Sequence, residues 1–171
     1  MNSSQQQEDY HWMEQALQLA HRAESEGEVP VGALVVNAGE RIGSGWNCPI
    51  GQQDPSAHAE IQAIRAAAKQ MNNYRIPGTT LYVTLEPCPM CAGAILQARI
   101  ARVVFAATDP RSGAAGSCFQ LLQSPKLNHR CVVESGVMAE ESGTLLRQFF
   151  RQRRGSHRHR KGSPEGPPGG A

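Results

Sequence analysis

The chain has 171 residues, of which 40% are hydrophobic and 19% charged, a length and composition typical of a single domain with its own apolar core. These values exclude wholesale disorder, and the apolar runs are far shorter than the roughly 18 residues of a membrane-spanning helix. The net charge of +2 conceals an asymmetry: residues 147–171 carry seven Lys/Arg and one acidic residue, whereas residues 1–146 carry ten and fourteen. A basic end on a mildly acidic body permits a nucleic-acid partner.

The first residues contain no basic segment followed by an apolar stretch, so we expect no secretory signal and a cytoplasmic protein. The five cysteines are an odd number, and thiols stay reduced in the cytosol. A metal-binding or catalytic role for some of them is therefore favoured over a disulfide framework.

Apolar residues at three- and four-residue steps predict an amphipathic helix from Tyr10 to Glu26. Two short strands, 33–37 and 41–46, flank a Gly-containing loop and predict a hairpin. A helix is expected from Ala57 to Met71, after the turn signal at 54–56. Further along the chain we expect strands at 79–85, 102–107 and 130–133, a helix at 89–98 and a final helix from 137 to about 154.

Helices that alternate with short strands predict an α/β fold, arranged as a three-layer α/β/α sandwich. The final helix is expected to turn Met138, Leu145, Leu146, Phe149 and Phe150 inward. Residues 109–117 are too rich in glycine for regular structure. The polar Gly- and Pro-rich segment 155–171 is expected to be disordered, so the folded domain is predicted to span 1–154.

Two short motifs carry the chemical signal: His58-Ala59-Glu60 and Pro87-Cys88-Pro89-Met90-Cys91. A catalytic zinc ion takes three nitrogen or sulfur ligands and leaves a fourth position for water, and His58, Cys88 and Cys91 supply such a set. Glu60 is not needed as a ligand and is free to move protons. The pattern H-x-E with P-C-x-x-C is the signature of zinc-dependent deaminases, in which the glutamate is the general acid/base.

Each of these motifs, taken alone, also has another interpretation. A lone H-x-E is usually an ordinary helix start, and a lone C-x-x-C can be a redox pair of the thioredoxin type. A structural zinc would need a fourth ligand, which Cys48, Cys118 or Cys131 could provide; otherwise these three are expected to pack as small hydrophobic residues. The separation of His58 from Glu60 by two positions does not suit one face of a regular helix. The two can converge if His58 lies where the backbone enters the helix.

The chain resembles the bacterial tRNA-specific adenosine deaminases, which belong to the cytidine-deaminase-like superfamily. The resemblance runs from about Tyr10 to Arg154. The zinc motifs point only to the superfamily, whereas the loop at 109–117 and the pair Asn128-His129 favour the tRNA branch. The resemblance also includes the segments 28–33, 45–47 and 54–57.

This resemblance implies a five-stranded mixed sheet, a homodimer, one zinc ion per subunit and conversion of adenosine to inosine at the wobble position of the tRNA anticodon. It further implies that Asn47 contacts the flipped nucleoside, that Asp109 contacts the RNA beside it and that Asn128 binds the anticodon loop. Each also has a structural interpretation: Asn47 as a strand end, Asp109 as part of a turn and Asn128 as a loop cap.

Two other functions are compatible with the sequence. One is a small-molecule guanine or cytosine deaminase of the same superfamily. The other is a non-catalytic, zinc-stabilised RNA-binding module, against which Glu60 argues, because a purely structural site needs no free carboxylate beside the metal.

Overall fold

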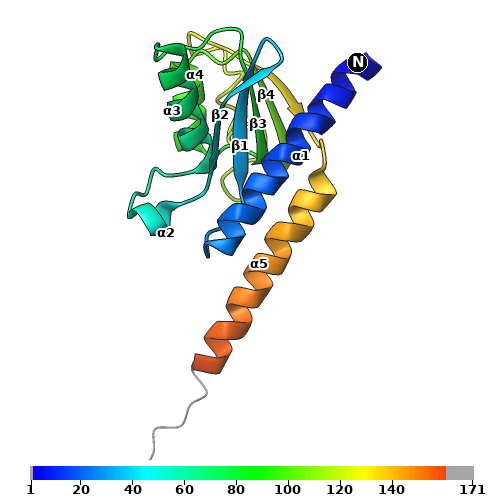
Figure 1. Ribbon diagram of the computed structural model, residues 1–171, viewed down its shortest axis with the longest axis vertical. Helices are drawn as coiled ribbons and strands as arrows, with labels where there is room; N and C mark the ends of the chain where they lie inside the picture. The colour runs from blue at the N-terminus through cyan, green and yellow to red at the C-terminus, as the bar shows by residue number, and fades with distance from the viewer. Residues whose placement is uncertain (1, 161–171) are drawn as a thin grey trace, which may run out of the picture.

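The computed structural model describes residues 2–160 and has five helices and five strands within that range (Figure 1). In chain order these are α1 (Ser3–Ser25), β1 (Gly32–Asn37), β2 (Glu40–Trp46), α2 (Pro49–Gln52), α3 (Ala59–Met71), β3 (Thr80–Leu85), α4 (Pro89–Gln97), β4 (Arg102–Ala107), β5 (Val132–Ser135) and α5 (Ala139–Arg160).

The five strands form one mixed sheet in the order β2-β1-β3-β4-β5. Strand β1 is antiparallel to both of its neighbours, whereas β3, β4 and β5 are parallel to one another. Helices α1 and α5 cover one face of the sheet, and α3 and α4 cover the other (Figure 1). The predicted three-layer α/β/α sandwich with a five-stranded mixed sheet is confirmed.

Alternation along the strands explains why both faces of the sheet are buried. In β1, Ala33 and Val35 pack with the core under α3 and α4, whereas Leu34 and Val36 pack with α1. Successive side chains of a strand point to opposite faces, so a fully apolar strand needs a helix layer on each side. The sequence supplies such strands at β1, β3 and β4.

The first helix begins at Ser3, seven residues before the expected start at Tyr10. The Asn2 side chain accepts a hydrogen bond from the backbone N–H of Ser4 at 3.3 Å and so caps the helix. This longer helix contains Asp9, which is 2% exposed and bonded through both carboxylate oxygens to Arg102 of β4, at 2.7 and 2.6 Å. The apolar pattern could not reveal this start, because the added turns are held by polar contacts.

The last helix continues through Gly155 to Arg160, so the end expected near Arg154 is wrong. A glycine inside a helix costs only about 1 kcal/mol relative to alanine, which is too little to end the helix here. Phe150 is 46% exposed and does not face the core as expected, whereas Leu145, Leu146 and Phe149 do. The disorder predicted for 155–171 is contradicted for 155–160, and the rest of that segment lies outside the described residues.

Strand β5 begins at Val132, two residues later than expected, and α2 was not predicted at all. No helix within residues 2–160 combines the length and the hydrophobicity needed to cross a membrane.

Candidate active site

The three predicted zinc ligands lie together in the structure. The ligand atoms of His58, Cys88 and Cys91 are all within 4.8 Å of one another. The Nδ1 atom of His58 is 3.6 Å from the Cys88 sulfur and 3.4 Å from the Cys91 sulfur. Tetrahedral zinc, with bonds of about 2.3 Å to sulfur and about 2.0 Å to nitrogen, would separate such a pair of donors by about 3.5 Å. This metal-ligand cluster therefore fits one zinc ion per chain.

Two helix N-termini bring the cluster together. His58 directly precedes α3 with an extended backbone (φ −72°, ψ 155°), and Cys88 precedes α4 in the same way (φ −76°, ψ 172°). Cys91 lies in the first turn of α4, whose first residue is Pro89. Proline suits that position because the first N–H of a helix has no partner within the helix. The partial positive charge of both N-termini favours thiolate and carboxylate groups here.

Hydrogen bonding within the cluster sets the protonation of its members. A hydrogen bond from the Cys91 thiol lowers the pKa of Cys88 to about 4, against the effect of burial and with help from His58. The same contact with Cys88, together with burial, raises the pKa of Cys91. The hydrogen bond to Cys88 also raises the pKa of His58. Cys88 is thus a thiolate at neutral pH, the form that ligates metal ions.

Glu60 lies in the first turn of α3, two residues after His58, and is 4% exposed. It is not a member of the metal-ligand cluster. The backbone of His58 is extended, whereas Glu60 is helical, so the directions of the two side chains are not set by helical spacing. This is the entry into the helix that the sequence required for the two residues to converge. Burial raises the pKa of Glu60 to about 7. A carboxyl group with this pKa can both accept and donate a proton near neutral pH, as a general acid/base must.

No other residue in the described part of the chain adds a fourth ligand to the cluster. Cys48 and Cys131 are buried, as expected for small hydrophobic residues. That expectation is wrong for Cys118, which is exposed because the glycine-rich loop carries it to the surface, where its thiol donates to the Pro110 carbonyl at 2.9 Å. Three protein ligands are the number found in catalytic zinc sites, whereas structural sites have four.

Asn47 lies at the end of β2, next to the cluster. Its side-chain oxygen accepts a hydrogen bond from the backbone N–H of Ala59 at 2.8 Å, so it caps α3 immediately after His58. His58 itself, although it occupies the capping position, forms no side-chain capping bond. Among the described residues, the Asn47 amide nitrogen has no hydrogen-bond acceptor and is free to donate to another molecule.

Asp109 opens the glycine-rich loop, and its carboxylate binds that loop. Oδ1 accepts from the backbone N–H groups of Arg111 at 3.0 Å and Ser112 at 3.4 Å, and Oδ2 accepts from the Ser112 hydroxyl at 2.9 Å. These bonds are typical of an aspartate that forms a turn. Asp109 therefore has a turn-forming role, whichever further contact it makes.

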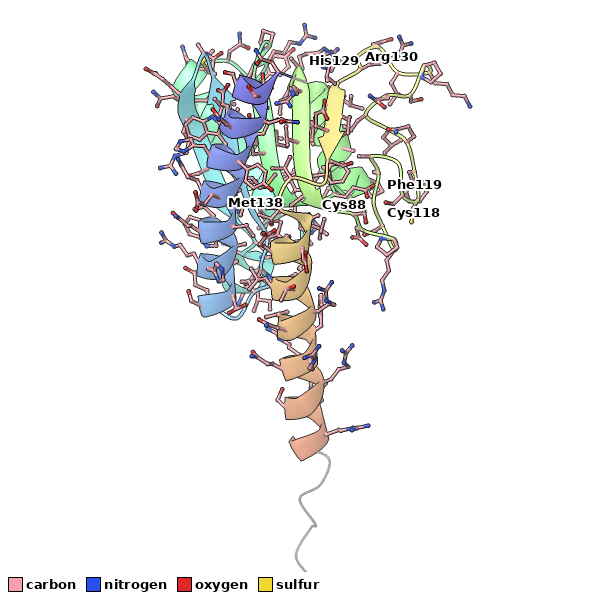
Figure 2. All side chains as sticks on the ribbon, turned by 90° about the vertical axis from the view of Figure 1, so that its right-hand side faces the viewer. Cys88, Cys118, Phe119, His129, Arg130 and Met138 are labelled. Carbon is pink, nitrogen blue, oxygen red and sulfur yellow. The ribbon has the colours of Figure 1, made fainter. Side chains whose placement is uncertain are left out.

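Asn128 is exposed, and the structure does not bring it to the metal-ligand cluster. Its neighbour His129 lies at the opposite end of the sheet from Cys88 (Figure 2). The His129 Nε2 atom is 2.7 Å from the carbonyl oxygen of Ile100, just before β4, whereas Cys88 follows the end of the parallel strand β3. A six-residue strand spans about 20 Å, which sets the scale of this separation.

Sequence reasoning missed Glu86, the residue between β3 and the Pro87-Cys88 turn. It is 3% exposed, and its carboxylate accepts hydrogen bonds from the loop that begins at Asp109. The only signal was an acidic residue after an apolar strand and directly before the metal-ligand motif. Apolar periodicity does not distinguish a buried acidic residue from the first residue of a loop.

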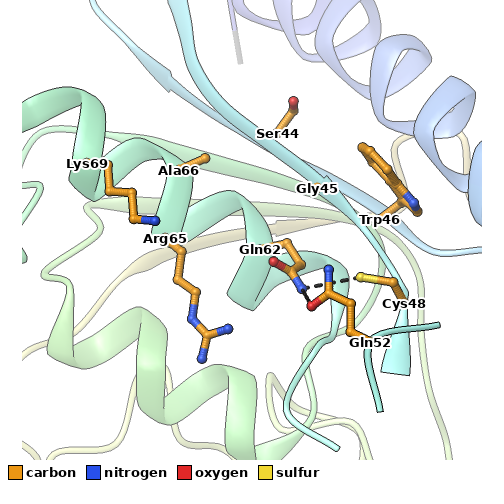
Figure 3. A pocket seen from close by; sticks show the side chains of 9 residues that line it. All are labelled: Ser44, Gly45, Trp46, Cys48, Gln52, Gln62, Arg65, Ala66 and Lys69. Atoms are coloured by element: carbon orange, nitrogen blue, oxygen red, sulfur yellow. Dashed lines mark hydrogen bonds between the residues drawn. The ribbon is translucent and has the colours of Figure 1, made fainter. Parts of the chain in front are cut away.

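A cavity of about 430 Å³ lies between α3 and the edge strand β2 (Figure 3). Arg65 and Lys69 of α3 line it, together with Gln62, whose amide donates to Gln52 Oε1 at 2.9 Å. The cavity lining includes Cys48 but no member of the metal-ligand cluster. It is therefore distinct from the candidate active site.

Comparison with known proteins agrees with this geometry. Residues 6–107 match the family described as the cytidine and deoxycytidylate deaminase zinc-binding region. The tRNA-specific adenosine deaminase of Haemophilus influenzae is 54% identical over 147 residues, which cover 85% of each chain. That of Bacillus subtilis is 46% identical and covers 86% of this chain and 91% of the relative.

A solved structure from a study of A-to-I editing by tRNA:A34 deaminases at the wobble position is 43% identical, with a TM-score of 0.77. The match covers 80% of this chain and 99% of that one. The matched family region contains all three residues of the metal-ligand cluster and Glu60. The chain belongs to the cytidine and deoxycytidylate deaminase zinc-binding family.

Proposed function

We propose that this protein is a zinc-dependent enzyme that hydrolytically deaminates adenosine to inosine at the wobble position of a tRNA anticodon. The observation that carries the proposal is a three-ligand zinc site with a buried, unliganded glutamate beside it. This combination supports hydrolytic deamination, and the names of the relatives at 54% and 46% identity support tRNA adenosine as the substrate.

In the proposed reaction, water adds to C6 of adenine and the C6 amino group leaves as ammonia, so that adenosine and water give inosine and ammonia. When bound by His58, Cys88 and Cys91, zinc supplies Lewis acidity that lowers the pKa of water toward about 7. Glu60 accepts a proton from the water and delivers it to N1 of adenine, which makes C6 electrophilic. Glu60 then takes the proton of the new C6 hydroxyl group and transfers it to the amino group, so that the C6–N bond breaks, ammonia leaves and the C6 carbonyl of inosine forms.

Substrate recognition is proposed to begin at Asn47. Its oxygen is occupied by the N-terminus of α3, which leaves the amide N–H₂ group to donate to the nucleoside. Asp109 is proposed to contact the RNA beside the reacting nucleoside while it holds its own loop together. Asn128 is proposed to bind a more distant part of the anticodon loop, because it is exposed at the other end of the sheet.

A single-stranded loop suits this site because the target base must leave its stack before it can enter the pocket, and unstacking costs least in a loop. We further propose that the enzyme acts as a homodimer in the cytoplasm. The tRNA substrate and the free cysteines of the described chain support the cytoplasmic location, and the resemblance to the bacterial enzymes supports the homodimer.

The experiment that tests the proposal is incubation of the zinc-loaded protein with an anticodon stem-loop that has adenosine at the wobble position. The expected products are inosine at that position and one ammonia per inosine. A matched stem-loop with guanosine at the wobble position and adenosine elsewhere in the loop should not react. Deamination of free guanine or cytosine without RNA would instead indicate a small-molecule deaminase. Zinc and RNA binding without ammonia release would indicate a non-catalytic module.

A further inference from the structure

We infer that Glu86 is a positioning residue, which fixes the loop 109–117 against the metal-ligand turn and so sets where the RNA substrate lies. The inference rests on the proposed function and deepens it. Glu86 does not touch the metal-ligand atoms, and none of the motifs that led to the active site includes it.

The Glu86 carboxylate is the hub of a hydrogen-bond network between two segments that are distant in sequence. One oxygen, Oε1, accepts from the backbone N–H of Asp109 at 3.1 Å and from the Ser117 hydroxyl at 2.5 Å. The other, Oε2, accepts from the backbone N–H groups of Ala115 at 3.0 Å and Ser117 at 3.1 Å. Four donors from both ends of the loop thus converge on one side chain.

Backbone hydrogen bonds add to this network: the loop binds the residue after Glu86, and Glu86 itself binds the last residue of β4. The Ala114 N–H donates to the Pro87 carbonyl at 2.8 Å, and the Glu86 N–H donates to the Ala107 carbonyl at 2.8 Å. Pro87 directly precedes the ligand Cys88. The loop is therefore attached by direct hydrogen bonds to the segment that precedes Cys88.

Gly113 shows how closely the loop packs on this carboxylate. A Cβ atom at Gly113 would collide with the Glu86 carboxylate, so only glycine fits where the loop crosses it. No basic side chain of the described residues forms an ion pair with Glu86. The buried negative charge is compensated by loop N–H and O–H donors, in the way that a concave array of amides binds an anion.

This arrangement has a functional consequence because the loop carries Asp109, the proposed RNA contact, and is followed by the exposed Phe119, which lies at the same end of the sheet as Cys88 (Figure 2). When this loop is not held in place, part of the binding free energy of the RNA is spent on ordering it, and the KM for the RNA rises. A rigid link between the loop and the metal-ligand turn avoids this cost.

The decisive variant is Glu86→Gln, which keeps the size of the side chain. An amide has one acceptor oxygen in place of two, and its N–H₂ group would face N–H donors. We expect zinc content to remain near one per chain and KM for the anticodon stem-loop to rise at least tenfold, with kcat within about threefold of the unmodified protein. Amide hydrogen exchange at Ala115 and Ser117 should accelerate.

The matched control is Asp9→Asn, which also neutralises a buried carboxylate but lies on α1, where it binds Arg102 and not the loop 109–117. It should lower thermal stability and leave KM unchanged. If Glu86→Gln lowered stability with KM unchanged, as the control does, Glu86 would be purely structural and the inference wrong. Loss of zinc in Glu86→Gln would equally overturn it, because Glu86 would then hold Cys88 and not the loop.

A second variant keeps the inference testable if Glu86→Gln does not fold. Ser117→Ala removes one donor and should raise KM severalfold, whereas Ser142→Ala, which removes a buried hydroxyl bonded to the Thr84 carbonyl, should not. Where Glu86→Gln does fold and Ser117 acts through Glu86, combining Ser117→Ala with Glu86→Gln should raise KM no further than Glu86→Gln alone. Additive effects would show that Ser117 contacts RNA independently and would count against the inference. An inactive unmodified protein would refute the proposed function. The hydrogen-exchange rates of the loop amides test the contact between Glu86 and the loop 109–117 separately, because they do not depend on activity.

Discussion

The side-chain oxygen of Asn47 is 2.8 Å from the backbone nitrogen of Ala59, so a residue at the end of β2 caps the helix that begins directly after the ligand His58. The side-chain oxygen of Asn47 thus has a structural role as a helix cap, whereas its side-chain nitrogen is left to donate to the substrate. Substitution can separate the capping role from the substrate-binding role.

Asn47→Asp should keep the capping bond, because a carboxylate accepts from a helix N-terminus as well as an amide does. It removes the N–H₂ donor, so deamination of the stem-loop should fall at least tenfold while Tm changes little. Asn47→Ala should lose both functions and also lose about 1 kcal/mol of stability. Inosine formation and thermal melts, measured on both variants, distinguish the capping role from the substrate-binding role. Full activity in Asn47→Asp would refute the proposed nucleoside contact.

Glu60 and the zinc ligands should respond differently to substitution. Glu60→Ala and Glu60→Gln should retain about one zinc per chain and lose deamination by at least a hundredfold, the scale of general acid/base catalysis. His58→Ala and Cys88→Ala should lose the metal, because they remove donors from a three-ligand site. Zinc quantification together with ammonia release tests the assignment. Loss of zinc from Glu60→Ala to the same extent as from Cys88→Ala would make Glu60 a ligand.

The Asp9–Arg102 pair should contribute to stability in a pH-dependent manner. Burial opposes ionisation of Asp9, but hydrogen bonds from Arg102 and Tyr82 outweigh it and lower the pKa of Asp9 below its usual value of 3.8. The folded state therefore gains stability from the ionised carboxylate above the unfolded-state pKa, and this gain disappears as the pH falls through the lower folded-state pKa.

Asp9→Asn should accordingly lower the free energy of unfolding by about 3 kcal/mol at pH 7, since it leaves Arg102 without its anionic partner. The difference between the unmodified protein and the variant should shrink as the pH falls below 3.8. Denaturant unfolding at several pH values measures this difference. A difference that does not change with pH would mean that altered packing, and not the charge, accounts for the effect.

The arginines of α5 should bind RNA phosphates without reading sequence. Arg147, Arg151, Arg154 and Arg158 are exposed and recur at three- and four-residue steps, which places them on one side of a helix that extends past the sheet (Figure 1). Arg153 differs, because it contacts the Gly27 carbonyl and the ring of Phe149.

Arg154→Gln combined with Arg158→Gln should therefore weaken stem-loop binding at low salt. It should also reduce the slope of log affinity against log salt by roughly 0.7–0.9 for each RNA phosphate that the variant no longer neutralises. The matched control removes two exposed charges elsewhere, Arg41→Gln and Arg75→Gln, and should leave the slope unchanged. Equal slopes in all three proteins would show that α5 binds no phosphate.

Local features of the sequence were sufficient to predict the layers of the fold and the metal-ligand cluster. Strict apolar runs bounded by turns identified β1, β3 and β4, and three- and four-residue periodicity identified α3. His58, Cys88 and Cys91 could be recognised because zinc chemistry restricts both donor type and number, and because each motif opens a helix. These properties depend on neighbouring residues, which a sequence displays directly.

Only the tertiary structure decided the contacts between polar groups far apart in the chain. Three such contacts join Asp9 to Arg102, Asn47 to Ala59 and Glu86 to the loop 109–117. A single hydrogen-bonded pair produces no periodic pattern in the sequence, so the sequence gives no sign of these contacts. The sequence predicts an end of α5 near Gly155, but a glycine penalty of about 1 kcal/mol is small beside the stabilising interactions summed over a long helix. The zinc chemistry was thus evident from local sequence, whereas the residues that hold it in position are defined by burial and by long-range hydrogen bonds.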